Sequence, residues 1–369
     1  MDEKNFYQKQ QKKFTPIGFI FMVGGLLLFA YFVKKTGVSE IFDGIKRLGA
    51  GFVLVVAASG LRYVVRTFGW TLCFEAPHKL RFRDAFKAYM VGDSLGNLTS
   101  LGIIMSEPTK AALVRDRVPL MVGLSAVAVQ NLLYSLSVML FIFSGTAAML
   151  INFNATMPKG LRIASFITLG VVVVFASIGF AVVRLRWKFL SRLLEGLEKR
   201  KIGQRLLQKR RAKASDFEDA VYGFYSRHKL RCFFILLLEL SFHLAGVLEV
   251  YITLYFINDG AVTFLAAYIL ESVNRIINVV FKFVPLRVGV DEAGSGLVTK
   301  VLAMGQIGVT LAVIRKARVV FWMTIGMILL ISRGLSPQSI AAETETAVAE
   351  EADASAAQAN AILPAGESS

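Results

Sequence analysis

Eight apolar runs follow one another along the 369-residue chain, most of them about as long as a membrane-spanning helix. A helix needs roughly 17 to 25 apolar residues to cross the hydrocarbon of a bilayer. The runs cover residues 17–33, 49–74, 84–105, 119–150, 163–183, 230–257, 261–284 and 310–331. The pattern predicts an all-α polytopic membrane protein, and the first run lacks a small-residue cleavage site, so we expect it to stay as an anchor.

The composition agrees with this prediction. Hydrophobic residues make up 55% of the chain and charged residues only 18%, which is low for a soluble domain. Lys and Arg exceed Asp and Glu by 42 to 26. In a membrane protein such an excess marks cytoplasmic loops rather than a nucleic-acid partner. We therefore expect a multi-pass protein of the bacterial plasma (inner) membrane.

Charge and composition divide the chain into five segments. Residues 184–231 are the most basic part, so this region is predicted to be cytoplasmic. Apolar and basic positions alternate at helical spacing over 184–213, which fits either a helix on anionic inner-leaflet headgroups or a solvated connector. The segments are a cytoplasmic N-terminal segment 1–16, a first membrane half 17–183, a basic linker 184–229, a second membrane half 230–334 and an acidic tail 335–369, predicted to be disordered.

The run 84–105 conflicts with a simple spanning model. A single crossing there would place the basic segment 78–83 outside, against the positive-inside rule. The run also contains Asp93, Asn97 and three glycines. We therefore predict that it enters the membrane and returns to the same side, around a polar cavity that satisfies its backbone.

Residues 98–114 and 282–298 look like one unit used twice. With Glu107 placed over Glu292, each stretch has a glycine-containing approach, an acidic residue, a short apolar helix and a basic residue eight positions later, Arg115 or Lys300. A repeat of opposite orientation would bring two broken helices together near the midplane, as in many secondary transporters. We predict about eight apolar helices arranged as an inverted repeat, two of them re-entrant or broken.

The run "PLRVGVDE", residues 285–292, resembles the Pro-x-x-x-Gly-x-x-Glu signature of the lysylphosphatidylglycerol synthase transmembrane region family, the flippase part of the multiple peptide resistance factor. The similarity extends in order over residues 17–331. Ser106, Glu107 and Lys110, preceded by Asn97, are similar to the family's pattern in the first half. In "AVIRKARVVFW" either Arg315 or Arg318 matches the basic position of the last helix. "VGDSLGN" together with "IRKARVVFW" looks closest to a hopanoid-associated subgroup.

The chain also departs from the family pattern. Ser106 stands where the family often has Gly, and Gln130, Asn131 and Tyr134 stand where it often has a Glu-Arg-x-x-Asp pattern. The loss of these charges puts a coupled-ion or headgroup role of that helix in doubt. Only the acidic tail follows the last apolar run, so no aminoacyl-transferase domain and no lipid aminoacylation are predicted.

Ionisable residues inside apolar runs are costly and normally face the bundle interior. Arg62 and Arg66, without an evident partner and one turn apart, suit phosphate binding or else snorkel to headgroups. Glu271 and Arg275 are spaced to neutralise each other. Glu107 and Glu292 are interpreted either as transport residues or as helix caps.

Glu239 and His243 share a helical face and fit a hydrogen-bonded or protonatable pair better than a metal site. We predict no metal and no cofactor. The candidate substrate-binding or transport residues are Glu107, Lys110, Pro285, Arg287, Gly289, Asp291, Glu292, Arg62, Arg66, Asn97, Glu239, His243, Arg315 and Arg318.

The sequence therefore predicts a flippase or lipid transporter that moves an amphiphilic, anionic lipid between leaflets through a polar midplane cavity. A non-transporting accessory or enzyme of hopanoid or phospholipid synthesis, and a carrier of small solutes or ions, are the alternatives. No HExxH motif and no nucleophile with a partner base supports an enzyme. The predicted partners are membrane lipids and no nucleic acid, and association into a homo-oligomer is left open.

Overall fold

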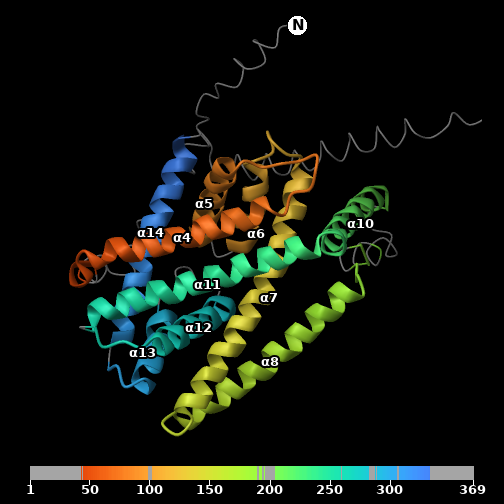
Figure 1. Cartoon of the computed structure of the whole chain (residues 1–369). Coiled ribbons are helices and arrows are strands. Elements are labelled where there is room, and N and C mark those ends of the chain that lie inside the picture. The colour runs from red at the N-terminus through yellow and green to blue at the C-terminus, as the bar shows by residue number, and fades with distance from the viewer. Residues whose placement is uncertain are drawn as a thin grey trace, which may run out of the picture.

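The computed structural model describes residues 43, 45–98, 102–188, 191–192, 195, 204–258, 260–281, 287, 289–305 and 307–332, and the regular structure in them is helical (Figure 1). The first apolar run 17–33, the tail 335–369 and Pro285 lie outside the described residues. The fold is all-α, as the apolar runs predict.

The two halves of the chain contain the same order of helices: one long, two short and one long. The first half has α4 (Gly51–Thr71), α5 (Phe82–Leu98), α6 (Gly102–Ala112) and α7 (Leu120–Phe153). The second has α11 (Lys229–Ile257), α12 (Phe264–Val280), α13 (Val290–Val301) and α14 (Ile307–Ser332). Between them lie α8 (Lys159–Arg184) and α10 (Gln204–Arg227).

The predicted break in the run 84–105 is present, because α5 and α6 form a helical hairpin instead of one spanning helix. Gly92 in α5 approaches α6 so closely that an added Cβ would lie 2.6 Å from Lys110 Cγ and 2.9 Å from the Ser106 carbonyl oxygen. In the second half α12 packs on α13 in the same way, with Gly294 against the Ile277 side chain. Each half therefore contributes a short hairpin between two long helices.

Helices α4 and α11 are antiparallel neighbours (Figure 1). Gly51 lies against Phe256 at one end of the pair, and the Phe74 carbonyl accepts a hydrogen bond from Arg231 at the other. Each hairpin packs on the last long helix of the other half: α5 packs on α14, and α12 packs on α7. Equivalent helices that run in opposite directions and exchange equivalent contacts are the arrangement of an inverted repeat.

Two glycines mark the exchanged contacts. Gly326 of α14 lies directly against Ser94 and the Met90 carbonyl of α5, and Gly145 of α7 lies directly against Ser272 of α12. A larger side chain at either position would push a long helix away from the hairpin of the other half. The junction between the halves thus depends on a small residue at matching places in the repeat.

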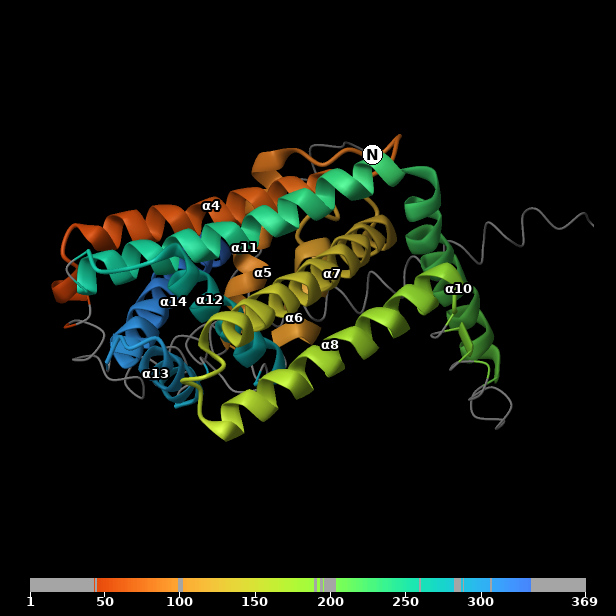
Figure 2. The same cartoon turned by 60° about the horizontal axis from the view of Figure 1, so that its bottom comes forward.

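Four helices in the described part are long and apolar enough to cross a membrane: α4, α7, α8 and α11. Of the other apolar runs, 84–105 is divided between α5 and α6, 261–284 yields the 17-residue α12, and 310–331 forms α14, which carries Arg315, Lys316 and Arg318. Only Ser165 of α8 is buried, and α8 packs along α7 at the edge of the bundle (Figure 2). An apolar helix exposed in this way is suited to contact lipid.

The end of α10 is attached to the loop between α4 and α5. Arg227 Nη2 lies 2.9 Å from Glu75 Oε2, and His228 Nε2 lies 2.8 Å from Glu75 Oε1. Partial burial acts to raise the pKa of the Glu75 carboxyl, but the hydrogen bonds and charge of Arg227 and the charge of His228 lower it overall. Glu75 is therefore ionised at neutral pH, and α10 and residues 75–83 lie at the same end of the bundle.

This attachment gives a direct test of the predicted topology. Single cysteines that replace His78 and Arg210 should both be labelled by a membrane-impermeant maleimide only after the cells are opened, because both lie at the end predicted to be cytoplasmic. The native Cys73 and Cys232 are buried and should give little background. Labelling of one position in intact cells and the other only in opened cells would contradict the hairpin topology.

Candidate functional site

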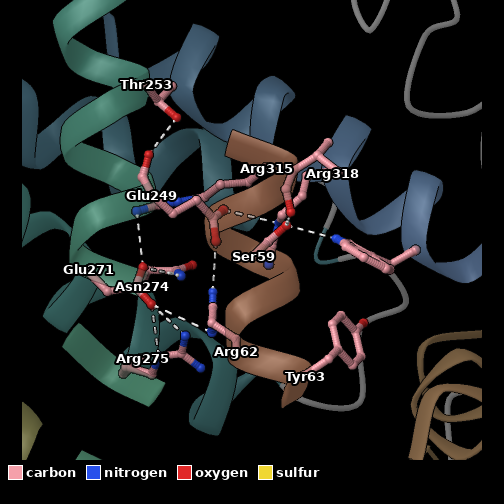
Figure 3. A network of polar contacts seen from close by, with 12 residues as sticks. Ser59, Arg62, Tyr63, Glu249, Thr253, Glu271, Asn274, Arg275, Arg315 and Arg318 are labelled. Atoms are coloured by element: carbon pink, nitrogen blue, oxygen red, sulfur yellow. Dashed lines mark hydrogen bonds and ion pairs between the residues drawn. The ribbon is translucent and has the colours of Figure 1, made fainter. Parts of the chain in front are cut away.

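A network of charged side chains is buried where α4, α11, α12 and α14 meet (Figure 3). Glu249 lies between two arginines: its Oε2 is 3.0 Å from Arg62 Nη1, and its Oε1 is 3.0 Å from Arg318 Nε. These contacts join α4, α11 and α14. Because the sequence places them in three separate apolar runs, only the folded bundle creates the cluster.

Glu271 of α12 is the second acidic centre of this network. It forms an ion pair with Arg275, one turn further along α12, as the sequence spacing predicts. Glu271 also lies 3.9 Å from Arg62 Nη2 and 3.6 Å from Arg315 Nη2, and Asn274 donates to it at 3.0 Å. The single carboxylate of Glu271 therefore lies within ion-pair distance of three guanidinium groups.

The arginine–glutamate network, defined as Arg62, Glu249, Glu271, Arg275, Arg315 and Arg318, does not balance its charges. Four positive groups face two negative groups, so its formal charge is +2. Asp93 of α5 is held by Tyr63 at 2.7 Å and by Asn97 at 3.2 Å, and counting its charge still leaves an excess of one. Buried charge without compensation is expensive in a medium of low polarity.

Arg315 connects the network to the second hairpin. Its Nη1 donates to Ser295 Oγ of α13 at 3.2 Å, and its Nη2 donates to the Leu270 carbonyl of α12 at 3.4 Å. Its Nε is buried and has no hydrogen-bond partner in the described residues. Arg315 and Arg318 therefore both belong to the site, Arg315 toward the hairpin and Arg318 toward α11.

Next to the arginine–glutamate network lies another ion pair, in which Arg66 Nε is 3.2 Å from Glu239 Oε2. Gln130 of α7 donates to Glu239 Oε1 at 2.8 Å and to the Arg66 carbonyl at 2.7 Å. The Arg66 guanidinium also lies 4.0 Å from the centre of the Tyr134 ring. Gln130 and Tyr134, which replace charged family positions, thus still take part in the polar core.

The expectation that Arg62 and Arg66 lack acidic partners is wrong. Arg62 pairs with Glu249 and Arg66 pairs with Glu239. Both arginines are buried inside the bundle, so neither one snorkels toward headgroups. The sequence could not show these pairs because the partners lie on α11, far along the chain.

The expected pair of Glu239 and His243 is also wrong. Glu239 turns to Arg66 and Gln130, whereas His243 contacts Ser137 Oγ at 3.1 Å and stacks on Phe141 with ring centres 4.8 Å apart. In the part of the chain that the structure describes, no three potential metal ligands of the His, Cys, Asp and Glu types gather.

The predicted carboxylates Glu107 and Glu292 both pair with a buried lysine. Glu107 Oε1 is 2.9 Å from Lys110 Nζ, and Glu292 contacts Lys316 of α14. The glutamate side chains are 24% and 25% exposed, whereas the lysines are 4% and 2% exposed. Each hairpin thus presents one partly accessible carboxylate with a buried countercharge.

The capping interpretation applies to only one of the two glutamates. Glu292 accepts a hydrogen bond from the Gly289 backbone N–H at 2.8 Å, at the start of α13. Glu107 lies well inside α6, so it does not cap that helix. Before α13, Arg287 and Gly289 adopt positive φ angles of 49° and 86°, and Arg287 Nε lies 3.4 Å from Asp291 Oδ2.

The first hairpin carries a counterpart of the Glu271–Arg275 pair. Asp93 and Asn97 of α5 are hydrogen-bonded at the same spacing of four residues, and each acidic residue is followed by the serine that faces a glycine of the other half. The candidate Asn97 therefore lies at the position in its half that Arg275 occupies in the other. One half carries a charged pair there and the other a polar one.

The model of the family described as "Lysylphosphatidylglycerol synthase TM region" matches residues 17–334. The chain belongs to this family. No curated protein and no solved structure matches it. Membership makes this a membrane protein related to lipids, and it confirms the family expected from "PLRVGVDE". The hopanoid-associated subgroup stays a prediction.

Several residues of the protein's polar core were not among the candidate site residues chosen from the sequence. Lys316 pairs with Glu292, Tyr63 donates to Asp93, and Trp322 Nε1 donates to Ser59 Oγ at 2.7 Å. The signal for Lys316 was available, because it belongs to the basic cluster "RKAR" within an apolar run. Tyr63 offers no such signal, since aromatic residues are common in any membrane helix, and Trp322 entered only through the likeness of "AVIRKARVVFW" to the family.

Proposed function

We propose that this member of the lysylphosphatidylglycerol synthase transmembrane region family moves an amphiphilic, anionic lipid between the leaflets of a bacterial plasma membrane. The observation that carries the proposal is the excess of four arginines, three of them buried and Arg318 partly exposed, over two buried glutamates at the meeting point of the two halves. No cofactor takes part in the proposed movement.

Charge supports an anionic headgroup as the cargo. Structural ion pairs inside a membrane bundle tend to balance, because each unpaired charge costs several kcal/mol in a medium of low polarity. A phosphate would supply the missing negative charge, and the guanidinium fork matches its oxygens. The buried Arg315 Nε, which has no partner in the described residues, is one donor that such a group could use.

The position of Arg62 suggests how binding could be coupled to movement. Within the network Arg62 is the one member from the first half, and its partners Glu249 and Glu271 come from the second half. A phosphate that forms an ion pair with Arg62 would compete with those carboxylates and weaken the contacts between the halves. In an inverted repeat the halves can then rock so that the site faces the other leaflet.

A leaflet assay tests this function. Purified protein is reconstituted in phosphatidylcholine vesicles with trace phosphatidylglycerol that carries a fluorophore on an acyl chain. We expect dithionite, which bleaches only the outer leaflet, to remove more than about half of the fluorescence in protein-containing vesicles and about half in protein-free vesicles. Equal bleaching in both would contradict the proposal.

The same vesicles separate the alternatives. A carrier of small solutes or ions would dissipate a solute or ion gradient and leave bleaching at the protein-free level. An accessory or enzyme of lipid synthesis would leave both the gradient and the extent of bleaching at the protein-free level. A labelled phosphatidylcholine should move more slowly than labelled phosphatidylglycerol, because it places a positive choline next to the arginine excess.

A further inference from the structure

The outer surface of the α4–α11 pair has an apolar groove that belongs to neither the network nor the hairpins. It is an open groove with a volume of about 350 Å³, lined by Phe68 of α4, by Leu72 just after α4, and by Phe234, Leu237, Leu238 and Ser241 of α11. Phe68, Phe234 and Leu237 are exposed hydrophobic side chains. The mostly apolar lining of the groove matches a hydrocarbon chain that lies along the helices.

One charged residue, Arg231, belongs to the lining of this groove. Its Nη1 donates to the Phe74 carbonyl at 3.2 Å, which holds the exposed guanidinium at the ends of α4 and α11. The neighbouring Lys229 is also exposed, and the basic segment 78–83 follows α4 at the same end. An apolar groove with a fixed arginine at its end complements an acyl chain attached to a phosphate.

The opposite end of the α4–α11 seam is different. The Phe256 ring packs on Gly51 so closely that an added Cβ would lie 2.6 Å from it. The groove therefore lies at the Arg231 end, where α10 is attached through Glu75. A ligand in the groove would come from the leaflet on the α10 side, which the basic linker predicts to be the inner one.

We propose that this groove binds one anionic phospholipid of the leaflet on the α10 side, with an acyl chain along Phe68, Leu72 and Leu238 and the phosphate on Arg231. The site is separate from the arginine–glutamate network, because Arg66 and Glu239 lie on the buried side of the same two helices. It does not depend on whether the protein moves lipid.

Photocrosslinking of the full-length protein in phosphatidylcholine nanodiscs tests the site. The probe is trace phosphatidylglycerol with a diazirine in one acyl chain, and crosslinked peptides are identified by mass spectrometry. We expect the crosslinks to concentrate in peptides that contain 68–72 and 234–241. The apolar face of α8, which includes exposed Phe166, Phe175 and Phe180, serves as the reference for ordinary lipid contact.

Two variants sharpen the test. Arg231→Gln should lower crosslinking in the groove by about fivefold, as expected for one exposed charge contact, and Arg184→Gln at the exposed end of α8 should leave it unchanged. Leu238→Trp should lower it by filling the groove. If either groove variant does not fold, competition on the wild type decides: unlabelled phosphatidylglycerol should reduce the signal more than added phosphatidylcholine.

Two results would overturn the proposal. Crosslinking of α8 as strong as that of the groove, without dependence on Arg231 or on the competing headgroup, would mean ordinary lipid contact only. Crosslinks between two copies of the chain at the groove, together with a dimer that Leu238→Trp disrupts, would assign the surface to a second copy.

Discussion

Glu271→Gln is expected to lower the unfolding free energy by about 3–5 kcal/mol and to reduce the amount of folded protein strongly. Glutamine has nearly the shape of glutamate but no negative charge. The change would leave Arg62, Arg275 and Arg315 without the carboxylate that they share. Thermal unfolding of detergent-purified protein, with the yield from membranes, measures the loss.

Glu75→Gln is the matched control for this variant. Glu75 also pairs with an arginine, Arg227, but both side chains are partly exposed at the end of the bundle. Surface pairs of this kind contribute about 0–1 kcal/mol, so the control should unfold near the wild-type temperature. Equal losses in the two variants would contradict the central place given to Glu271.

Gly326→Leu is expected to destabilise the protein by about 3 kcal/mol or more, because the new side chain would meet Ser94 and the Met90 carbonyl of α5. Backbone atoms cannot move aside as a flexible side chain can. We therefore expect α14 to separate from the first hairpin and the melting temperature to fall.

Gly170→Leu in α8 is the control, since nothing lies within 4 Å of a Cβ placed there. It should be neutral or slightly stabilising, because leucine has the higher helix propensity. Gly145→Leu, at the matching place in the repeat, should resemble Gly326→Leu, since its new side chain would meet Ser272. A strong loss in only one of the two would contradict the equivalence of the exchanged contacts.

Much of the fold could be predicted from the sequence. The apolar runs, the polar residues within 84–105 and the likeness of 98–114 to 282–298 indicate an all-α membrane bundle with two interrupted segments. These features are local, because an apolar run of helix length and a break within it can be recognised in about 20 consecutive residues. The last helix, α14, is apolar on average, and the sequence did not show that its basic cluster faces inward, with Arg315 and Lys316 buried.

The site was predicted less completely. The sequence identified Arg62, Arg315 and Arg318 as unusual but could not pair them. Arg62 and Glu249 are 187 positions apart, and their contact depends on the antiparallel packing of α4 on α11. The sequence favoured Glu239 with His243 because they share one face, whereas tertiary packing turned them to different neighbours, Arg66 and Ser137.

Arg318→Gln probes the excess charge without leaving a buried carboxylate unpaired. Glu249 keeps Arg62 as its partner at 3.0 Å, and the Arg318 side chain is 14% exposed, more than the others in the network. The variant should therefore fold. Arg318→Lys keeps the positive charge and serves as the matched control.

The most direct measurement is the ratio of transfer rates of labelled phosphatidylglycerol and labelled phosphatidylcholine in reconstituted vesicles, for wild type, Arg318→Gln and Arg318→Lys. We predict that wild type prefers phosphatidylglycerol, that Arg318→Gln lowers this preference by about tenfold, as for one lost charge-assisted contact, and that Arg318→Lys retains most of it. The same ratio in all three proteins would contradict the claim that the arginine excess selects an anionic headgroup.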